Sequence, residues 1–430
     1  MSAPVHASAK AAVAERIAAI WRIESGRLIG ALVRLVRDVG LAEDLAQDAL
    51  LAALEQWPEG GVPDNPGAWL MTTAKHRAID RLRRDILHRE RAGSLAAEIE
   101  TQLRDAQEQP DADAAPSATV GDDLLRLIFI ACHPVLSPEA RVALTLRMLG
   151  GLSTDEIARA FLVPEPTIAQ RIVRAKRTLG ERQIAFELPD AEALAARLDS
   201  VLGVIYLIFN EGYAATAGAD WLRPALCEEA LRLGRILAGL APRIAEVHGL
   251  LALMEIQASR LRARTSPEGE PILLPDQDRA RWDRLLIGRG LAALATAEKL
   301  AEHRGSYTLQ AGIAACHARA ATAAATDWPR IVRLYDELLD LMPSPVVALN
   351  RAVAVGMAEG PAAGLAEVDE LVALASLAAY PWLPSVRGDL LAKLGRHREA
   401  EAEFLRAASL TQNEREQRFL RKRAEDSAAS

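Results

Sequence analysis

The sequence predicts an all-α protein built from several helical modules. Apolar residues recur at helical spacing along most of the 430 residues, and no stretch alternates apolar and polar residues convincingly as a strand does. Only 4% of the residues are aromatic and alanine is abundant, which favours closely packed helices over sheets. At roughly 150 residues per domain, a chain of this length is expected to hold two to four modules.

The charge and the cysteines limit the class of protein. A net charge of −7 argues against nucleic-acid binding over the whole surface, but it permits local basic faces. The three cysteines are widely spaced and form no CxxC pair, which predicts buried, reduced thiols in a reducing compartment. The longest apolar run, residues 201–209, is too short to span a bilayer, and the N-terminus shows no signal sequence. We therefore expect a cytoplasmic protein with no membrane partner.

No enzyme motif is present in the sequence. It has no phosphate-binding glycine loop, no HExxH pair, no calcium loop and no nucleophile elbow. The eight histidines include no plausible metal pair, since the adjacent Cys132 and His133 cannot easily chelate one ion. We expect no catalytic residue, no cofactor and no metal site, and hence a protein that acts by binding.

The first element with a functional pattern is an amphipathic helix over residues 40–57. Glu43 and Asp44 are expected in its first turn, where acidic groups oppose the helix dipole. Its apolar side repeats at helical spacing from Leu41 through Leu45. The opposite side is a candidate partner-binding face made of Asp44, Gln47, Asp48 and Leu51. By composition alone, the same helix equally fits a plain bundle helix.

A basic helix follows, from Lys75 to Arg91, with seven bases against three acids. Ile79 and Leu82 keep one face buried, while the rest is free to follow a phosphate backbone. Trp69 precedes this helix, where an aromatic ring can stack on unpaired bases or pack in a core. The candidate DNA contacts here are Trp69, Lys75, His76, Arg77, Arg81 and Arg84. Such a run of bases taken alone also fits a solvated helix face.

An acidic segment separates this module from the next. Residues 98–123 hold eight acids against one base, and Pro110 and Pro116 interrupt any helix. This composition is typical of an extended linker whose charges repel one another. We therefore divide the chain into residues 10–97, a linker over 98–123, residues 124–188 and residues 189–430.

The segment over residues 151–177 has the pattern of a helix-turn-helix. Ser153 and Glu156 form a capping box at the start of a short helix, and Pro164 lies in the turn. In the second helix one apolar stripe repeats at spacings of four, three and four: Ile168, Ile172, Ala175 and Leu179. The side chains left facing outward are Thr167, Gln170, Arg171, Arg174 and Arg177. These long hydrogen-bonding side chains favour DNA binding over a purely structural hairpin.

The C-terminal part predicts stacked helical hairpins. The breaks at residues 358–363 and 395–400 are offset by 37 residues, close to the 34-residue unit of tetratricopeptide (TPR) repeats. The stretches 222–240 and 327–341, each followed by proline, fit the same plan. Within the apolar stretch around residue 206, Asn210, Glu211 and Tyr213 fit either a binding site or a buried polar turn between two helices.

Three of these motifs, in this order, resemble a bacterial sigma factor of the extracytoplasmic-function (ECF) type. Glu43-Asp-Leu-Ala-Gln-Asp-Ala-Leu50 resembles the region 2 helix that docks on the clamp helices of core RNA polymerase. Residues 69–84 resemble the part of region 2 that melts and reads the minus-10 promoter element. Residues 136–179 resemble region 4, whose helix-turn-helix reads the minus-35 element. Two departures are His76, where the family usually carries asparagine, and Pro164-Glu-Pro166, where a small polar cap is more usual.

The resemblance covers about residues 20–182 and implies a function. The chain is expected to bind core RNA polymerase and promoter DNA and to direct promoter-specific initiation without covalent chemistry. Residues 189–430 resemble the long C-terminal extension of one sigma-factor group, which implies that the extension controls the sigma half, through an unknown regulatory protein or ligand. The alternative is a TPR-type interaction scaffold or a helix-turn-helix regulator without sigma activity.

Overall fold

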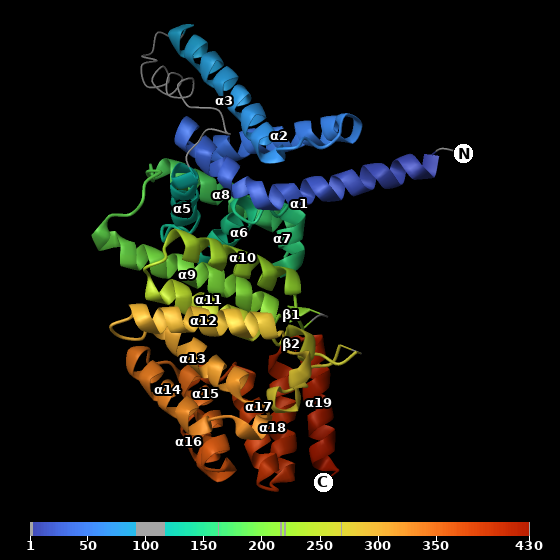
Figure 1. The fold of residues 1–430 in the computed structure, drawn as a ribbon. Coiled ribbons are helices and arrows are strands. Elements are labelled where there is room, and N and C mark those ends of the chain that lie inside the picture. Colours follow the sequence, from blue (N-terminus) through green and yellow to red (C-terminus); the bar gives the residue numbers. More distant parts are fainter. Residues whose placement is uncertain are drawn as a thin grey trace. The chain divides into compact units, whose positions relative to one another are not determined.

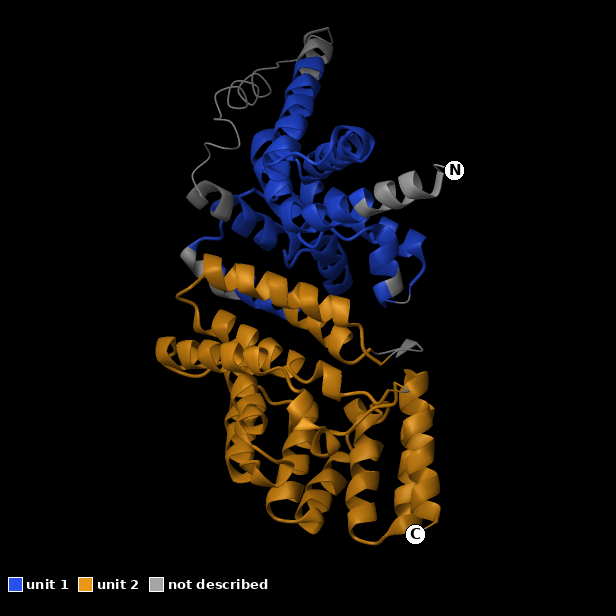
Figure 2. Ribbon diagram, turned by 45° about the vertical axis from the view of Figure 1, so that its right-hand side comes forward, with its two compact units in different colours: residues 1–204 blue, residues 205–430 orange. Residues whose placement is uncertain are grey.

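A computed structural model describes residues 3–91, 117–161, 163–215, 217–218, 221–267 and 269–429 of the chain. These residues form two compact units, residues 1–204 (unit 1) and residues 205–430 (unit 2), coloured separately in Figure 2. The all-α fold predicted from the sequence is confirmed. The described residues are mostly helical, and the strands among them are a two-residue parallel pair, β1 (Ala217–Gly218) with β2 (Gln412–Asn413).

Unit 1 consists of helices, and most of the contacts between them involve the long first helix. Its helices, labelled in Figure 1, are α1 (Ala3–Val36), α2 (Val39–Gly60), α3 (Pro66–Arg91), α5 (Ser117–Ala131), α6 (Pro138–Met148), α7 (Thr154–Phe161), α8 (Glu165–Glu181) and the first part of α9 (Ala191–Tyr213). α1 packs against α2, α3 and α5. Its buried apolar side chains include Leu28, Ile29 and Leu32, which recur at helical spacing.

Two boundaries differ from those expected. α2 begins at Val39, because the Asp38 carboxylate accepts the Leu41 N–H at 2.6 Å and caps the helix. Glu43 and Asp44 therefore lie beyond the first turn. α5 begins at Ser117, so the last residues of the expected linker are helical, and Asp123 accepts a hydrogen bond from Arg34 at 2.8 Å. The remainder of that predicted linker, residues 98–116, lies outside the described residues.

Unit 2 is a series of helical hairpins. Its α-helices are the end of α9, then α10 (Pro224–Leu240), α11 (Ala245–Ala258), α12 (Arg284–Leu300), α13 (Ser306–Arg319), α14 (Trp328–Leu341), α15 (Pro345–Ala358), α16 (Pro361–Leu371), α17 (Trp382–Lys393), α18 (His397–Leu410) and α19 (Glu414–Ala428). Short 3-10 helices are η1 (Leu261–Ala263), η2 (Leu274–Asp276), η3 (Arg279–Arg281), η4 (Ala323–Ala325) and η5 (Ala375–Leu377). From α13 onward each α-helix packs against the next, as the predicted hairpins require.

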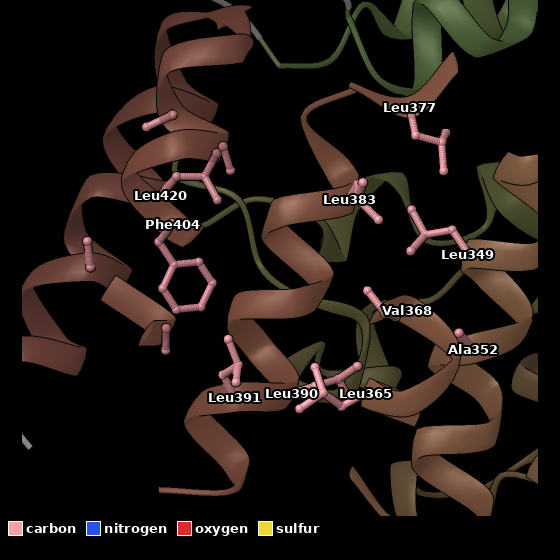
Figure 3. Close-up of a cluster of buried hydrophobic side chains, with 14 residues drawn as sticks. Leu349, Ala352, Leu365, Val368, Leu377, Leu383, Leu390, Leu391, Phe404 and Leu420 are labelled. Carbon is pink, nitrogen blue, oxygen red and sulfur yellow. The ribbon is translucent and has the colours of Figure 1, made fainter. Parts of the chain in front are cut away.

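The last hairpins share an apolar core and a repeated ion-pair pattern. Leu365, Leu390 and Phe404 come from successive helices and meet in one cluster (Figure 3). In α15, Arg351 donates to Asp336 at 2.7 Å and to Glu367 at 2.6 Å. In α17, Arg387 makes the same two bonds, to Asp369 at 2.8 Å and to Glu403 at 2.7 Å. Each arginine thus ties the helices before and after its own, and the pattern recurs after 36 residues.

We expect Arg387→Ala to lower the free energy of unfolding of unit 2 by about 1–2 kcal/mol. The substitution removes two charge-assisted hydrogen bonds from a half-buried side chain that joins α16 to α18. Urea unfolding followed by hydrogen exchange of α16, α17 and α18 measures the loss. The matched control is Arg396→Ala, because Arg396 pairs only with the exposed Glu399 one turn away, and little change is expected. Equal losses in the two variants would show that Arg387 does not tie the hairpins together.

Candidate nucleic-acid interface

The helix-turn-helix predicted over residues 151–177 is present as α7 and α8. The Ser153 hydroxyl accepts the Glu156 N–H at 3.1 Å, and the Glu156 carboxylate accepts the Ser153 N–H at 2.8 Å, so the capping box is confirmed. Gly151, in the turn before α7, has a positive φ of 65°. A Cβ there would lie 2.9 Å from the Ser25 hydroxyl on α1, so glycine is required both for the turn and for close packing on α1.

The two faces of α8 are sharply different. Ile168, Ile172, Ala175 and Leu179 are all buried, which confirms the predicted inward stripe. Gln170, Arg174 and Arg177 are exposed and, at spacings of four and three, share one face. Val173 lies among them with 63% of its surface exposed, although the sequence pattern did not single it out. An apolar group between hydrogen-bonding side chains suits a major groove, where it can contact a thymine methyl group.

Thr167 and Arg171 lie at the edge of this face. Both are half-buried rather than fully exposed. Glu139, at the start of α6, has a pKa below its ordinary value, first because its own backbone N–H and the Ser137 hydroxyl hydrogen-bond to it, and further because Arg171 and Arg141 are nearby. Arg171 therefore lies close to the carboxylate of Glu139 and is the least accessible of the three arginines predicted to contact DNA on α8.

The second group of candidate DNA contacts lies along α3. His76, Arg81 and Arg84 are exposed, and Lys75 and Arg77 are half-buried. Trp69 lies in the first turn of α3 and is half-buried, with its ring edge-on to the buried Trp57 at 5.2 Å between centroids. Packing on Trp57 fixes the position of Trp69 while part of its surface stays accessible. The packing role that the sequence allowed is thus present, and stacking of Trp69 on DNA bases stays a prediction.

The candidate partner-binding face of α2 is accessible. Asp44, Asp48 and Leu51 are exposed and Gln47 is half-buried. Leu54, one turn after Leu51, is also exposed and was missed, although its spacing from Leu51 would have revealed it. Arg77 approaches Asp48 with 3.9 Å between their charged atoms, so α3 and this face of α2 are adjacent. Two exposed leucines beside carboxylates are typical of a surface that binds another protein.

A buried ion pair cluster joins α2 to the helix-turn-helix. The Glu43 side chain is 3% exposed and accepts a hydrogen bond from Arg147 Nε on α6 at 2.7 Å. Lys176, on α8, pairs with the other oxygen of the same carboxylate. Arg147 also donates to the Leu152 carbonyl oxygen at 3.2 Å. No sequence pattern singles out Glu43 for this role, because its partners lie more than 100 residues away.

Further contacts hold the same helices together. Arg22 on α1 pairs with the capping-box residue Glu156 at 2.7 Å. A pocket of about 1040 Å³ lies between the α1–α2 corner and the end of α8, lined among others by Arg34, Arg37 and Lys176. The three candidate surfaces on α2, α3 and α8 therefore belong to one compact unit, in which α2 contacts α8.

The polar residues near 210 are placed differently from the expected turn. They lie in the last turns of helix α9, where Glu211 pairs with Arg223 and the Tyr213 ring stacks on Phe209 at 5.6 Å. Cys132, Cys227 and Cys316 are free and buried, as predicted. Among the described residues, no group of three or more histidine, cysteine or acidic side chains is arranged to hold a metal ion. No helix there is long and apolar enough to cross a membrane.

Comparison with known proteins shows that three family models match segments of this chain. Models described as Sigma-70 region 2, Sigma-70 region 4 and a family of unknown function (DUF6596) match residues 21–85, 126–179 and 197–298. ECF RNA polymerase sigma factor SigK of Mycobacterium ulcerans is 32% identical over 158 residues, 36% of this chain and 78% of the relative. Probable ECF RNA polymerase sigma factor SigI of Mycobacterium tuberculosis is 30% identical over 176 residues, 41% and 58% of the two chains. An uncharacterized protein of Rhizobium meliloti is 44% identical over 403 residues, 93% of each chain.

Proposed function

Because this chain belongs to the ECF RNA polymerase sigma factors, we propose that α2, α3 and α8 carry the contacts by which it directs transcription initiation. The protein binds core RNA polymerase and promoter DNA. The exposed face of α2 docks on the polymerase, α3 contacts the minus-10 element, and the exposed face of α8 enters the major groove at the minus-35 element. The protein forms and breaks no covalent bond itself, and it acts in the cytoplasm, where the polymerase is.

The arrangement of α8 is the observation that supports this assignment best. Its apolar stripe is buried in unit 1, so the face with Gln170, Arg174 and Arg177 is directed outward. Guanidinium groups recognise guanine, and amide groups recognise adenine, through paired hydrogen bonds in the major groove. A second helix with this face, following a capped first helix and a proline turn, has the parts that a DNA-reading helix requires.

The direct test is run-off transcription with purified core polymerase and a set of candidate promoters. We expect a promoter-specific transcript that depends on this protein. The interaction scaffold that the sequence also allowed predicts no promoter-specific transcript with any template. A transcript from every template alike would contradict the proposed promoter reading, because core polymerase starts without selection when no factor directs it.

We expect Arg171→Ala and Arg174→Ala each to reduce discrimination between the correct promoter and a mismatched one by about 1–3 kcal/mol. Each change removes a donor from the α8 face, and the larger effect is expected for the exposed Arg174. Competition binding of the polymerase complex to the two promoters measures the difference. The control is Arg182→Ala, which changes an exposed arginine at the C-terminal cap of the same helix. Loss of polymerase binding in the Arg174 variant would instead make this face a protein interface.

Unit 2 is proposed to control the sigma activity of unit 1. It has its own apolar cores and its own ion-pair pattern, which a passive tail does not need. Stacked helical hairpins offer surfaces that bind peptides or partner domains, so a regulatory protein or ligand can act there. The chain passes from unit 1 to unit 2 at residue 204, within helix α9, so no loop at that point provides length for a detachable mask. A scaffold that keeps unit 1 ready for polymerase agrees better with this helical connection.

A further inference from the structure

The segment that joins α11 to α12 in unit 2 (Figure 1) contains a group of arginines without an acidic partner. Residues 259–283 run through the short helices η1, η2 and η3. Five of their arginines make no ion pair in the described part of the chain: Arg260, Arg262, Arg264, Arg279 and Arg281. Elsewhere in unit 2, arginines such as Arg351 and Arg387 each hold two carboxylates. Arg243, Arg284 and Arg330 of unit 2 likewise make no ion pair in the described part of the chain, so the feature that distinguishes this segment is the burial of Arg264.

One of these arginines is almost fully buried. Arg264 is 6% exposed, and its guanidinium lies 3.5 Å from the centre of the Tyr213 ring and 4.6 Å from that of Trp221. Burial lowers the pKa of Arg264 from its ordinary value. The aromatic faces compensate part of the buried charge. Nη1 of Arg264 still has no hydrogen-bond partner, and a buried cation without an anion is unfavourable.

The neighbouring side chains add further unused donors. Arg260 lies 5.9 Å from the centres of both the Tyr213 and the Trp282 rings, so it belongs to the same cluster. Its Nε and the Trp282 Nε1 are both buried and without an acceptor. Buried polar groups are normally satisfied. Three buried donors without a hydrogen-bond partner in the protein, together with two guanidinium charges, make this cluster electropositive.

The positive potential extends across the cluster. Arg279 lies 4.5 Å from the centre of the Trp282 ring and donates to the His317 carbonyl oxygen at 2.5 Å. The pKa of His317 is lowered to about 4, first because the ring is buried and then because Arg260 and Arg279 repel its cationic form. Burial disfavours any charge at this position, whereas the repulsion by Arg260 and Arg279 reflects the positive charge gathered here.

A pocket adjoins this cluster at Trp282, which lines the pocket and contacts the arginines. It has a volume of about 580 Å³ and is lined by Arg262, Thr265, Ala280, Arg281, Trp282 and Asp283. Arg262 and Arg281 are exposed and free to turn toward a ligand. The Asp283 carboxylate already accepts the N–H groups of Leu285 and Leu286 as the cap of α12, so it is engaged within the protein. The pocket therefore offers donors and positive charge with one engaged carboxylate.

We propose that this pocket binds a small anion carrying phosphate or carboxylate groups, with Arg262 and Arg281 as direct contacts and Trp282 at its wall. The buried Arg264 and the half-buried Arg260 and Arg279, which contact the same group of rings, supply a field that attracts negative charge. The volume admits a molecule larger than a single phosphate ion. This site is independent of the promoter and polymerase contacts, since it lies in unit 2, and a ligand there would give unit 2 an input of its own.

The test is isothermal titration of the full-length protein with pyrophosphate and, separately, with citrate, at constant ionic strength set with chloride. We expect saturable binding of at least one of the two. The double variant Arg262→Gln with Arg281→Gln should weaken it by about tenfold or more, since two charge-assisted contacts are removed. Trp282→Phe should also weaken it, because the ring is largely kept while the Nε1 donor is lost. The matched control, Arg284→Gln, changes an adjacent exposed arginine outside the pocket and should leave binding unchanged.

Either ligand binding alone would support the site and would tell phosphate from carboxylate chemistry. The proposal is overturned when neither anion binds beyond the response to chloride. It is equally overturned when the double variant and the Arg284 control bind with the affinity of the original protein, because the anion would then be held elsewhere. Far-ultraviolet circular dichroism of each variant checks that unit 2 remains folded. None of these measurements depends on transcription, so a negative result would contradict the anion site without contradicting the proposed sigma function.

Discussion

Replacing Glu43 with glutamine is expected to lower the free energy of unfolding of unit 1 by about 3 kcal/mol. The change keeps the shape of the side chain but leaves Arg147 and Lys176, both largely buried, without their shared carboxylate. Removal of one member of a buried ion cluster costs more than the contact itself contributes, because charges remain that water cannot reach. Urea unfolding, with hydrogen exchange of α2, α6 and α8, gives the measurement.

The neighbouring carboxylate provides a matched control. Asp44 is one residue further along α2, is 76% exposed, and lies 3.8 Å from the same Lys176 amine. Asp44→Asn should therefore change stability by less than about 1 kcal/mol. Glu43→Leu combined with Arg147→Met and Lys176→Met should recover most of the loss, since no charge is left unpaired. Equal effects of the Glu43 and Asp44 variants would contradict the buried cluster.

The Glu43 variant is also expected to change the hydrogen exchange of two helices at once. Glu43 joins the helix proposed to dock on polymerase to the helix proposed to read DNA, so its loss should increase exchange in α2 and α8 together. An increase confined to α2 would mean that α8 is held mainly by other contacts, such as the Arg22–Glu156 pair.

The variant Asp48→Lys distinguishes an effect on polymerase binding from an effect on the stability of unit 1. It should leave unit 1 stable yet weaken polymerase binding, because this exposed charge would be reversed on the docking face.

Local rules predicted the helix-turn-helix well. A capping box needs only residues three apart, and the stripe from Ile168 to Leu179 follows helix periodicity, so both were readable from the sequence. The same holds for the exposed residues of α2. The start of α2 was placed too late, because Asp38 was not recognised as its cap, and the linker was extended seven residues too far into α5. These errors concern element ends, where several capping residues compete.

Tertiary contacts explain what the sequence did not reveal. Glu43 has the composition of a helix N-terminal charge, and only the folded chain brings Arg147 and Lys176 to it. Asn210, Glu211 and Tyr213 fitted either a binding site or a buried polar turn, whereas α9 continues to Tyr213, Glu211 pairs with Arg223 and the Tyr213 ring contacts Arg264. Burial of an arginine beneath two aromatic rings has no local signature. For the same reason, no sequence pattern singled out the arginines of residues 259–283.

Removal of unit 2 is expected to lower promoter-specific transcription by a factor of about five or more, within the usual range of coupling between two sites. The position of the cut matters. The first part of α9 belongs to unit 1, where Ser200 donates to the Cys132 carbonyl oxygen at 2.6 Å and Arg197 to that of Phe129 at 2.9 Å. A chain ending at Leu188 loses these bonds, whereas one ending at Val204 keeps them.

Comparing the two truncated chains separates regulation from simple destabilisation. Circular dichroism first establishes that each is folded, and run-off transcription with core polymerase then gives its activity relative to the full-length protein. Lower activity of the chain ending at Val204 supports unit 2 as a scaffold that keeps the polymerase and promoter surfaces ready. Higher activity makes unit 2 a mask that a signal must remove. Activity equal to that of the full-length protein, in vitro and in cells, would remove the basis for control by unit 2. A loss seen only in the chain ending at Leu188 would then be assigned to the missing contacts of Arg197 and Ser200.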